Sequence, residues 1–245
     1  MTPIVIIPAR LAATRLPGKP LADIAGAPMI VRVLRQAERA AVGPVAVAAG
    51  DPEIARAVRA AGGAAVLTDP DLPSGSDRVL AALGELDPDG RFDVVLNLQG
   101  DMPFIAPAVL TACLGVLAAE PDCDIATAIA PEASHADRAD PAVVKAVVSL
   151  LEGDPRGRAL YFTRSVLYGD APIWKHVGVY AYRRQALERF CLAPPSPLER
   201  REQLEQLRAL ELGLSIWAAV VDETPISVDT PADLEAARAF AREQP

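Results

Sequence analysis

Three cationic side chains follow the first apolar run of the sequence. Ile4 to Ile7 are apolar and β-branched, and Arg10, Arg15 and Lys19 come soon after them. Such a run is typical of a buried parallel strand, and open α/β sheets bind ligands beyond the carboxyl ends of their strands. Each guanidinium can hold phosphate oxygens in a bidentate manner, and an ammonium adds a mobile point charge. The segment therefore predicts a polyphosphate site, although a solvated basic loop has the same composition.

The basic segment lacks the two common fingerprints of nucleotide-binding loops. It contains neither the Gly-x-x-x-x-Gly-Lys-Ser/Thr pattern nor the Gly-x-Gly-x-x-Gly pattern. A phosphate would therefore be held mainly by side chains instead of by a cradle of backbone amides. The missing glycine pattern also argues against a dehydrogenase.

A carboxylate follows the most convincing central strand of the sequence. Residues 93–98 read DVVLNL and run directly into Gln99, Gly100 and Asp101. Mg²⁺ prefers oxygen ligands and usually takes one or two protein carboxylates, with water and phosphate completing its shell. Asp229, which precedes the last predicted helix, becomes a second ligand if that helix packs beside this strand. Alternatively, Asp101 could serve only as the N-cap of a helix and not as a Mg²⁺ ligand.

Two further polar segments admit two interpretations each. Ser74, Gly75 and Arg78 could offer polar groups to the edge of a ligand, or they could belong to a helix start capped by Ser76. In residues 174–184, apolar side chains alternate with Gly178, Tyr180 and Tyr182, next to Lys175 and His176. The strand face that carries the two tyrosines suits a polyhydroxylated acidic ligand or an oligomer interface equally well.

The spacing of apolar residues indicates the elements that must position these groups. Short strands alternate with amphipathic helices in the first half, which predicts a parallel sheet with right-handed crossovers and a Rossmann-like α/β fold. His135 is expected at the surface. The predicted strands are 4–7, 45–49, 64–67, 93–98, 125–130, 143–150 and 215–221, and the predicted helices include 29–41, 52–61 capped by Asp51, 77–86 and 198–212.

Composition excludes several classes of protein. A net charge of -8 and a pI near 4.9 argue against general nucleic-acid binding, which needs a basic face. Three widely spaced cysteines give neither a disulfide framework nor a zinc pattern. The apolar start lacks a basic n-region, and no run approaches the roughly 18 residues of a membrane span. We therefore expect a cytoplasmic protein without a membrane partner.

A series of short motifs, taken in order, is similar to one known family. The segments IIPAR, TRLPGKPL, SGSDR, NLQGDMP, YFTR, HVGVYAYRR, PPSPLE, LEQLR and VDTPADLE resemble the 3-deoxy-manno-octulosonate cytidylyltransferase family, also called CMP-Kdo synthetases, over essentially the whole chain. The resemblance implies a nucleotide-diphospho-sugar transferase fold with a smaller sugar-binding and dimerisation subdomain. It also implies a Mg²⁺-dependent reaction of CTP with Kdo that yields CMP-Kdo and pyrophosphate for lipopolysaccharide biosynthesis, and a homodimer.

The resemblance also assigns roles to individual residues of one cytidylyltransferase domain. It implies a CTP-binding half at residues 1–130 and a sugar-binding half at 131–245. One departure is Met102, which stands where the family has glutamate. The implied triphosphate ligands are Arg10, Arg15 and Lys19, the cytidine pocket is Ser74, Gly75 and Arg78, the nucleotide or sugar contact is Gln99, the Mg²⁺ ligands are Asp101 and Asp229, and the Kdo contacts are Arg164, His176, Tyr180, Glu205 and Gln206.

Two alternatives to this activity stay open at the level of sequence. The protein could transfer cytidylate to another acidic sugar, such as 8-amino-Kdo or a sialic-acid-like sugar. It could also be a catalytically silent nucleotide-binding protein on the same fold. The joint presence of Arg15, Lys19, Asp101 and Asp229 argues against the silent alternative.

Overall fold

The chain folds into two compact units. The computed structural model describes residues 1–12, 15–132, 136–167, 169, 171–222 and 224–243, so that His135 lies outside the described residues. Unit 1 comprises residues 1–110 and 225–245, and unit 2 comprises residues 111–224. The predicted functional halves, 1–130 and 131–245, concern ligand binding and stay a prediction.

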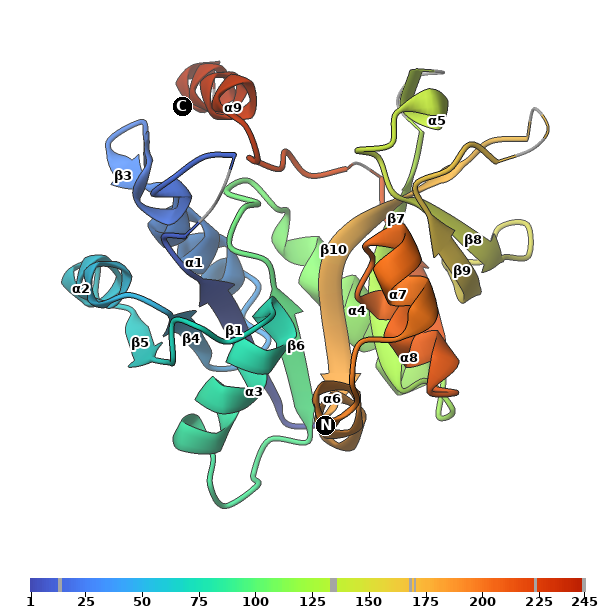
Figure 1. The fold of residues 1–245 in the computed structure, drawn as a ribbon, viewed down its shortest axis with the longest axis horizontal. Helices are drawn as coiled ribbons and strands as arrows, with labels where there is room; N and C mark the ends of the chain where they lie inside the picture. The colour runs from blue at the N-terminus through green and yellow to red at the C-terminus, as the bar shows by residue number, and fades with distance from the viewer. Residues whose placement is uncertain (13–14, 133–135, 168, 170, 223, 244–245) are drawn as a thin grey trace. The chain divides into compact units, whose positions relative to one another are not determined.

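Unit 1 is built on a parallel four-stranded sheet with the order β5-β4-β1-β6 (Figure 1). Val5 of β1 pairs with Val45 of β4 on one side and with Leu96 of β6 on the other. The apolar runs that predicted these strands are almost wholly buried in β1, β4 and β6. The pairings between the four strands are all parallel, which confirms the predicted parallel sheet. The strands are β1 (Pro3–Ala9), β4 (Val45–Ala49), β5 (Ala64–Leu67) and β6 (Val94–Leu98).

Helices cover both faces of this sheet. Successive residues of a strand face opposite sides, and at the end of β6 Gln99 faces Gly75 of one helix whereas Gly100 faces Ile30 of another. Asp51 stands at the predicted N-cap position, but its side chain makes no capping bond. These helices are α1 (Met29–Arg39), α2 (Pro52–Ala60) and α3 (Gly75–Leu86), and the first of them follows the short helix η1 (Lys19–Leu21) and the hairpin β2 (Asp23–Ile24) and β3 (Ala27–Pro28).

The helix α3 begins earlier than its predicted start at residue 77. Ser74 is the N-cap, since its Oγ accepts a hydrogen bond from the Asp77 amide at 3.2 Å. The alternative of Ser76 as the cap is therefore wrong, because Ser76 is already the second residue of the helix and is buried. The next helix, α4 (Pro107–Ala119), carries the chain from unit 1 into unit 2.

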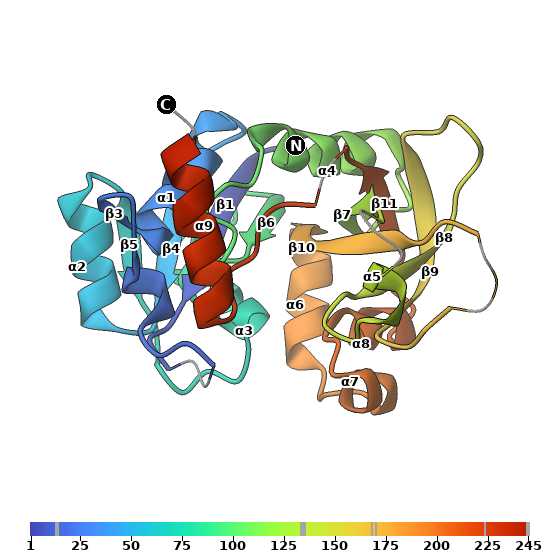
Figure 2. The same cartoon turned by 90° about the horizontal axis from the view of Figure 1, so that it is seen from above.

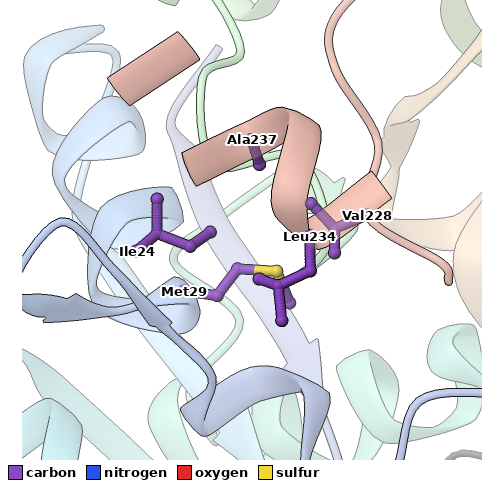
Figure 3. Close-up of a cluster of buried hydrophobic side chains, with 5 residues drawn as sticks. All are labelled: Ile24, Met29, Val228, Leu234 and Ala237. Carbon is purple, nitrogen blue, oxygen red and sulfur yellow. The ribbon is translucent and has the colours of Figure 1, made fainter. Parts of the chain in front are cut away.

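The C-terminal segment returns to unit 1 and ends in α9 (Pro231–Glu243), which is labelled in Figure 2. This helix packs beside β2. Arg238 of this helix donates a 2.9 Å hydrogen bond to the Asp23 carbonyl. A buried apolar cluster holds the return in place, and Figure 3 shows its five side chains converging from separate segments. The cluster consists of Ile24, Met29, Val228, Leu234 and Ala237.

Unit 2 contains a mixed sheet with the order β10-β7-β11-β9-β8. β7 is parallel to β11 and antiparallel to β10, and β9 is antiparallel to both of its neighbours. In β10, Val177, Val179 and Ala181 are buried as the alternation predicts, but Tyr182 is buried as well. The strands are β7 (Ile125–Pro131), β8 (Lys145–Ser149), β9 (Arg156–Thr163), β10 (Trp174–Arg183) and β11 (Ile216–Val220), and the short helix α5 (Ala136–Ala139) precedes β8.

The single helix predicted over 198–212 is wrong. The chain forms α7 (Pro197–Glu202) and α8 (Gln206–Glu211), separated by Gln203 in the left-handed conformation at φ 56°. The bend lets Arg208 reach back to Glu199, to which its Nε and Nη2 each donate at 2.8 Å. α6 (Arg184–Leu192) precedes this pair. Across the described part of the chain, no helix has the length and apolar character needed to cross a membrane.

Candidate active site

A pocket of about 370 Å³ lies in unit 1, where β1 and β6 end. A volume of this size is typical of small-molecule sites, and the carboxyl ends of parallel strands are where such sites occur. The structure gathers nine predicted site residues from four separate segments around this pocket. They are Arg10, Arg15, Lys19, Ser74, Gly75, Arg78, Gln99, Asp101 and Asp229.

Lys19 is the electrostatic centre of the pocket. Its Nζ lies 3.1 Å from Asp101 Oδ2 and 3.0 Å from Asp229 Oδ1, and its side chain is only 17% exposed. Arg15 Nη2 approaches the other oxygen of Asp229 at 3.3 Å. Burial alone would lower the pKa of Lys19, but the two carboxylates outweigh burial and the pKa of Lys19 is raised. Burial raises the pKa of Asp101, and the charge of Lys19 counteracts part of this rise. We call these four residues the charged cluster.

Backbone geometry brings Lys19 to this position. Gly18 adopts φ 71°, a conformation that L side chains rarely adopt, and accepts the bond that starts η1, from the Leu21 amide at 2.9 Å. The Gly18 amide in turn donates to the Leu11 carbonyl at 3.2 Å. Leu11 is held by Asp51, whose Oδ2 accepts from the Leu11 amide at 2.7 Å. Asp51 therefore anchors the basic segment to the start of α2, a use that its position in the sequence did not indicate.

Asp101 and Asp229 lie together because two distant segments run side by side. The Val228 amide donates to the Asp101 carbonyl at 2.9 Å. Thr230 caps α9 in a reciprocal arrangement, in which its Oγ1 accepts from the Asp233 amide at 3.2 Å and its own amide donates to the Asp233 carboxylate at 2.8 Å. Thr230 therefore caps the helix, and the Asp229 carboxylate is left for cations. Asp101 is not a helix N-cap, because the next helix, α4, begins only at Pro107.

Gly100 permits the close approach of the strand ends. A Cβ at this position would stand 2.9 Å from the Pro8 carbonyl oxygen, a distance that side chains do not tolerate. Gly75 is less restricted, because a Cβ there would make ordinary contacts with Pro8 and Gln99. The glycine before Asp101 is therefore needed to seat that carboxylate beside β1.

Arg78 lines the pocket, but its guanidinium donates hydrogen bonds to oxygens of the protein itself. Its guanidinium donates to Thr68 Oγ1 at 2.6 Å, to the Asp69 carbonyl at 2.8 Å and to the Pro70 carbonyl at 3.1 Å. Burial, followed by the nearby charge of Arg10, lowers the pKa of Arg78. Arg78 therefore holds the turn after β5 against α3, and its contact with a ligand stays a prediction.

The aromatic residues predicted to bind the sugar form a neutral cluster in unit 2. His176 lies 5.4 Å from Tyr180 between ring centroids, and its Nε2 lies 2.9 Å from Thr127 Oγ1. The Thr127 hydroxyl donates to the Val179 carbonyl at 2.8 Å, so it accepts from the imidazole. Burial lowers the pKa of His176 to about 4, and burial together with Glu205 raises the pKa of Tyr180. We call Thr127, His176 and Tyr180 the neutral cluster.

Arg164 is held by carbonyl oxygens of unit 2. Its Nε donates to the Glu202 carbonyl at 3.2 Å and its Nη1 to the Pro141 carbonyl at 3.0 Å. The Glu202 carboxylate accepts from the Arg164 amide at 3.1 Å, and the buried Lys145 donates to the Arg164 carbonyl at 3.1 Å. Glu202, Lys145 and Thr127 were not singled out from the sequence, because their significance depends on tertiary partners. Gln206 is buried in α8, one position after Glu205.

The donor set of the charged cluster fits a divalent cation. Within the described ranges, no group of three or more His, Cys, Asp or Glu side chains is arranged to hold a metal ion. Asp101 and Asp229 nevertheless direct carboxylate oxygens at a single ammonium group. Two carboxylates supplemented by water and phosphate are a normal ligand set for a hard cation. Met102, which follows Asp101 in the sequence, is buried, and its side chain contains no oxygen.

Comparisons with known proteins bear on the family and the fold of this chain. A family model described as "Cytidylyltransferase" matches residues 4–216. The 3-deoxy-manno-octulosonate cytidylyltransferases of Parvibaculum lavamentivorans and Rhodospirillum centenum are 58% and 59% identical to this chain, over 97% of it and 92% and 93% of their own lengths. A CMP:2-keto-3-deoxy-manno-octonic acid synthetase solved in complex with CTP superimposes with a TM-score of 0.90 at 39% identity, with full coverage of both chains. These matches confirm the predicted α/β nucleotidyltransferase fold. The chain belongs to the 3-deoxy-manno-octulosonate cytidylyltransferase family.

Proposed function

We propose that this protein transfers cytidylate from CTP to 3-deoxy-D-manno-octulosonate, giving CMP-Kdo and pyrophosphate. One observation carries the proposal beyond the family relationship. Lys19, Arg15, Asp101 and Asp229 meet at the carboxyl ends of β1 and β6, in a pocket large enough for part of a nucleotide. Fixed cations together with an acidic pair are what a metal-dependent transfer of a nucleotidyl group requires.

The triphosphate would bind along the basic segment. Arg10 and Arg15 are exposed at the pocket wall and supply guanidinium groups for phosphate oxygens. The cytidine would lie toward Ser74, Gly75 and Gln99, which line the pocket where α3 begins. Phosphate and base would thus be held by different segments of one pocket.

The reaction would proceed by direct displacement at the α-phosphorus. The anomeric hydroxyl of the sugar attacks in line and loses its proton to water, a bond forms between that oxygen and the α-phosphorus, and the bond to the bridging oxygen of pyrophosphate breaks. Lys19 and Arg15 stabilise the negative charge that collects on the departing pyrophosphate. Asp101 and Asp229 would hold Mg²⁺, which when bound neutralises phosphate charge and lowers the pKa of an attacking hydroxyl. No covalent intermediate with the protein is needed.

Lys19 would change partners when substrates bind. Its ammonium now lies at hydrogen-bonding distance from both carboxylates that would hold the cation. Phosphate oxygens offer Lys19 an alternative anionic partner, so nucleotide binding would release the carboxylates. We therefore expect divalent cations to bind far more tightly with CTP than without it.

The sugar would be recognised by unit 2. A neutral imidazole and an un-ionised phenol suit the hydroxyls of a sugar, and the guanidinium of Arg164 suits its carboxylate. Glu205 and Gln206 are assigned to the same ligand through the family resemblance. The homodimer, the cytoplasmic location and the role in lipopolysaccharide biosynthesis are further expectations of that resemblance.

Pyrophosphate release tests this proposal directly. The purified protein is assayed with CTP, Kdo and Mg²⁺, in parallel with UTP, with ATP, with 8-amino-Kdo, with a sialic acid and without sugar. Release that requires CTP and Kdo together supports the proposal. Release with a different acidic sugar would replace the assigned sugar, and CTP binding without release from any pair would identify a silent binding protein.

A further inference from the structure

Asn97 is the one polar residue inside β6. The strand reads VVLNL, every one of its residues is buried, and the Asn97 side chain has no exposed surface. A buried amide without partners costs several kcal/mol on typical scales, so such a residue is retained where it makes hydrogen bonds. The bonds that Asn97 makes are therefore informative.

Asn97 links the first turn of α3 to the pocket. Its Nδ2 donates to Ser76 Oγ at 3.4 Å, and its Oδ1 accepts from Gln99 Nε2 at 3.0 Å. The two-residue period of an extended chain places residues 97 and 99 on the same face. That face is the one covered by α3, since Gly75 also lies against Gln99.

The far end of this chain of hydrogen bonds is a wall of the pocket. Gln99 lines the pocket beside Gly75, where a Cβ on Gly75 would stand 3.6 Å from Gln99 Oε1 and 3.8 Å from Nε2. Because Nε2 is bound to Asn97, the opposite end of the amide is the acceptor Oε1. The hydrogen bond to Asn97 therefore leaves Oε1 as the atom of Gln99 that can accept a hydrogen bond from a ligand.

We propose that Asn97, seated by Ser76, is a positioning residue that fixes the Gln99 amide so that its Oε1 accepts a hydrogen bond from a donor on the substrate. The inference rests on the proposed function, since it assumes that the pocket holds CTP. The candidate donors are the exocyclic amine of cytosine, a ribose hydroxyl and a hydroxyl of the acidic sugar. The first of these would separate CTP from UTP, because uracil carries an oxygen acceptor at the same place.

The expected effect is that of misdirecting one acceptor in a preorganised site. A released Gln99 amide can rotate and present its NH₂ group, which an amine donor cannot use. Loss of one such bond typically lowers kcat/KM by about 10- to 100-fold. The loss would appear mainly in KM, because the amide binds the substrate without contacting the reacting phosphorus.

The test compares Asn97→Leu with Val95→Ile, a change in the buried core of the same strand face that leaves the hydrogen bonds in place. Kinetics are measured by pyrophosphate release, and binding of CTP and UTP by calorimetry. We expect Asn97→Leu to lower kcat/KM about 10- to 100-fold and Val95→Ile to change it less than about 3-fold. Equal effects of the two variants would overturn the proposal.

A double-mutant cycle separates positioning from a merely structural role. If Asn97 acts through Gln99, Asn97→Leu changes kcat/KM little in a Gln99→Leu background. Additive losses would show that Asn97 supports the fold alone. If Asn97→Leu does not fold, Ser76→Ala takes its place, with a smaller loss in the same direction expected, and no loss would contradict the proposal.

Substrate analogues identify the donor. A fall in the preference for CTP over UTP identifies the cytosine amine, a fall in the preference for CTP over dCTP identifies the ribose 2′-hydroxyl, and a rise in KM for the sugar alone identifies a sugar hydroxyl. No change in any of the three would overturn the inference. If the wild type releases no pyrophosphate from any pair, the proposed function fails, whereas calorimetry with CTP and UTP still tests the role of Asn97.

Discussion

The charged cluster of unit 1 and the neutral cluster of unit 2 handle burial in opposite ways. Lys19 in unit 1 is 17% exposed and keeps its charge because Asp101 and Asp229 lie about one hydrogen-bond length away. In unit 2, no carboxylate lies within ion-pair distance of the half-buried His176 among the described residues, and burial keeps its imidazole neutral. Desolvation disfavours the charged form at both sites, and the presence or absence of a counter-charge determines whether the buried group is charged or neutral.

This difference matches two kinds of ligand chemistry. A cluster of paired charges can exchange one ionic partner for another, which suits phosphates and a divalent cation. A cluster of neutral donors and acceptors discriminates hydroxyl groups without the cost of desolvating an ion. The comparison therefore predicts that charge-removing variants of the charged cluster abolish turnover, whereas in unit 2 the loss of an ion pair that does not involve Arg164 affects mainly stability.

The largest expected effect comes from neutralising the charged cluster. Lys19→Ala and Asp101→Asn should each lower kcat at least about 100-fold, because each removes a preorganised charge worth roughly 3 kcal/mol in the transition state. Circular dichroism would show that the fold is retained. Arg156→Ala, which breaks the 2.7 Å pair with Glu120 in unit 2, serves as the control. Turnover like that of the wild type in either variant would refute the assignment of the site.

The ion pair of Arg208 and Glu199 tests the contribution of charge to unit 2. The Arg208 side chain is 6% exposed and Glu199 is 13% exposed. Glu199→Ala should lower the free energy of unfolding by about 3 kcal/mol, because it removes the close carboxylate partner of a buried guanidinium. Urea unfolding measures this change, and Glu188→Ala, in a more exposed pair with Arg184, should cost less than about 1 kcal/mol. If the two costs were equal, burial would not explain the difference.

The neutral imidazole of His176 predicts a pH-dependent stability. Burial lowers the pKa of His176 to about 4 in the folded protein, whereas in the unfolded chain the pKa is near the ordinary value of about 6.5. Between these values the unfolded state binds the extra proton, so the contribution of His176 to stability is present above about pH 6.5 and is lost as the pH falls.

His176→Gln isolates this contribution. Between pH 7 and 4.5 the wild type should lose about 1 to 2 kcal/mol more stability than the variant, less than the full shift would give because the ring is only half-buried. Chemical unfolding over this pH range measures the difference. Parallel pH profiles for the two proteins would show that the imidazole is not held neutral.

The smallest expected effect concerns the cap of α9. Thr230→Ala removes the bond from Thr230 Oγ1 to the Asp233 amide and should cost about 1 kcal/mol of stability. Thr230→Ser keeps the hydroxyl and should restore most of this loss in a thermal melt. Since Asp229 rather than Thr230 belongs to the charged cluster, Thr230→Ala should lower turnover much less than Asp229→Asn.

The sequence predicted most of unit 1 because its signals are local. β1 and β4 are continuous apolar runs, β6 is apolar except for Asn97, and α1 carries a helical stripe of buried residues from Ile30 to Ala37. Motifs that follow these strands predicted the pocket residues, since the carboxyl ends of parallel strands meet at one edge. Local signals suffice where the topology is regular.

The features that were missed depend on partners far away in the sequence. The 198–212 segment has a helical pattern, but the Glu199–Arg208 pair and the left-handed Gln203 divide it. Asp51 resembles an ordinary cap until the Leu11 amide is seen beside it. Asn97 is conspicuous as a polar residue in an apolar run, but only the folded chain shows that it holds Gln99.

The position of Asp229 has a consequence for biosynthesis. Unit 1 is completed by residues 225–245, which are translated only after the whole of unit 2. A ribosome-bound chain can form the parallel sheet early, because domains fold from the N-terminus during synthesis. Until residue 229 has been translated, Asp101 is the only carboxylate partner of Lys19 in the charged cluster. The full set of charges is assembled only when the last segment emerges, so a chain terminated before residue 229 lacks one carboxylate of the charged cluster.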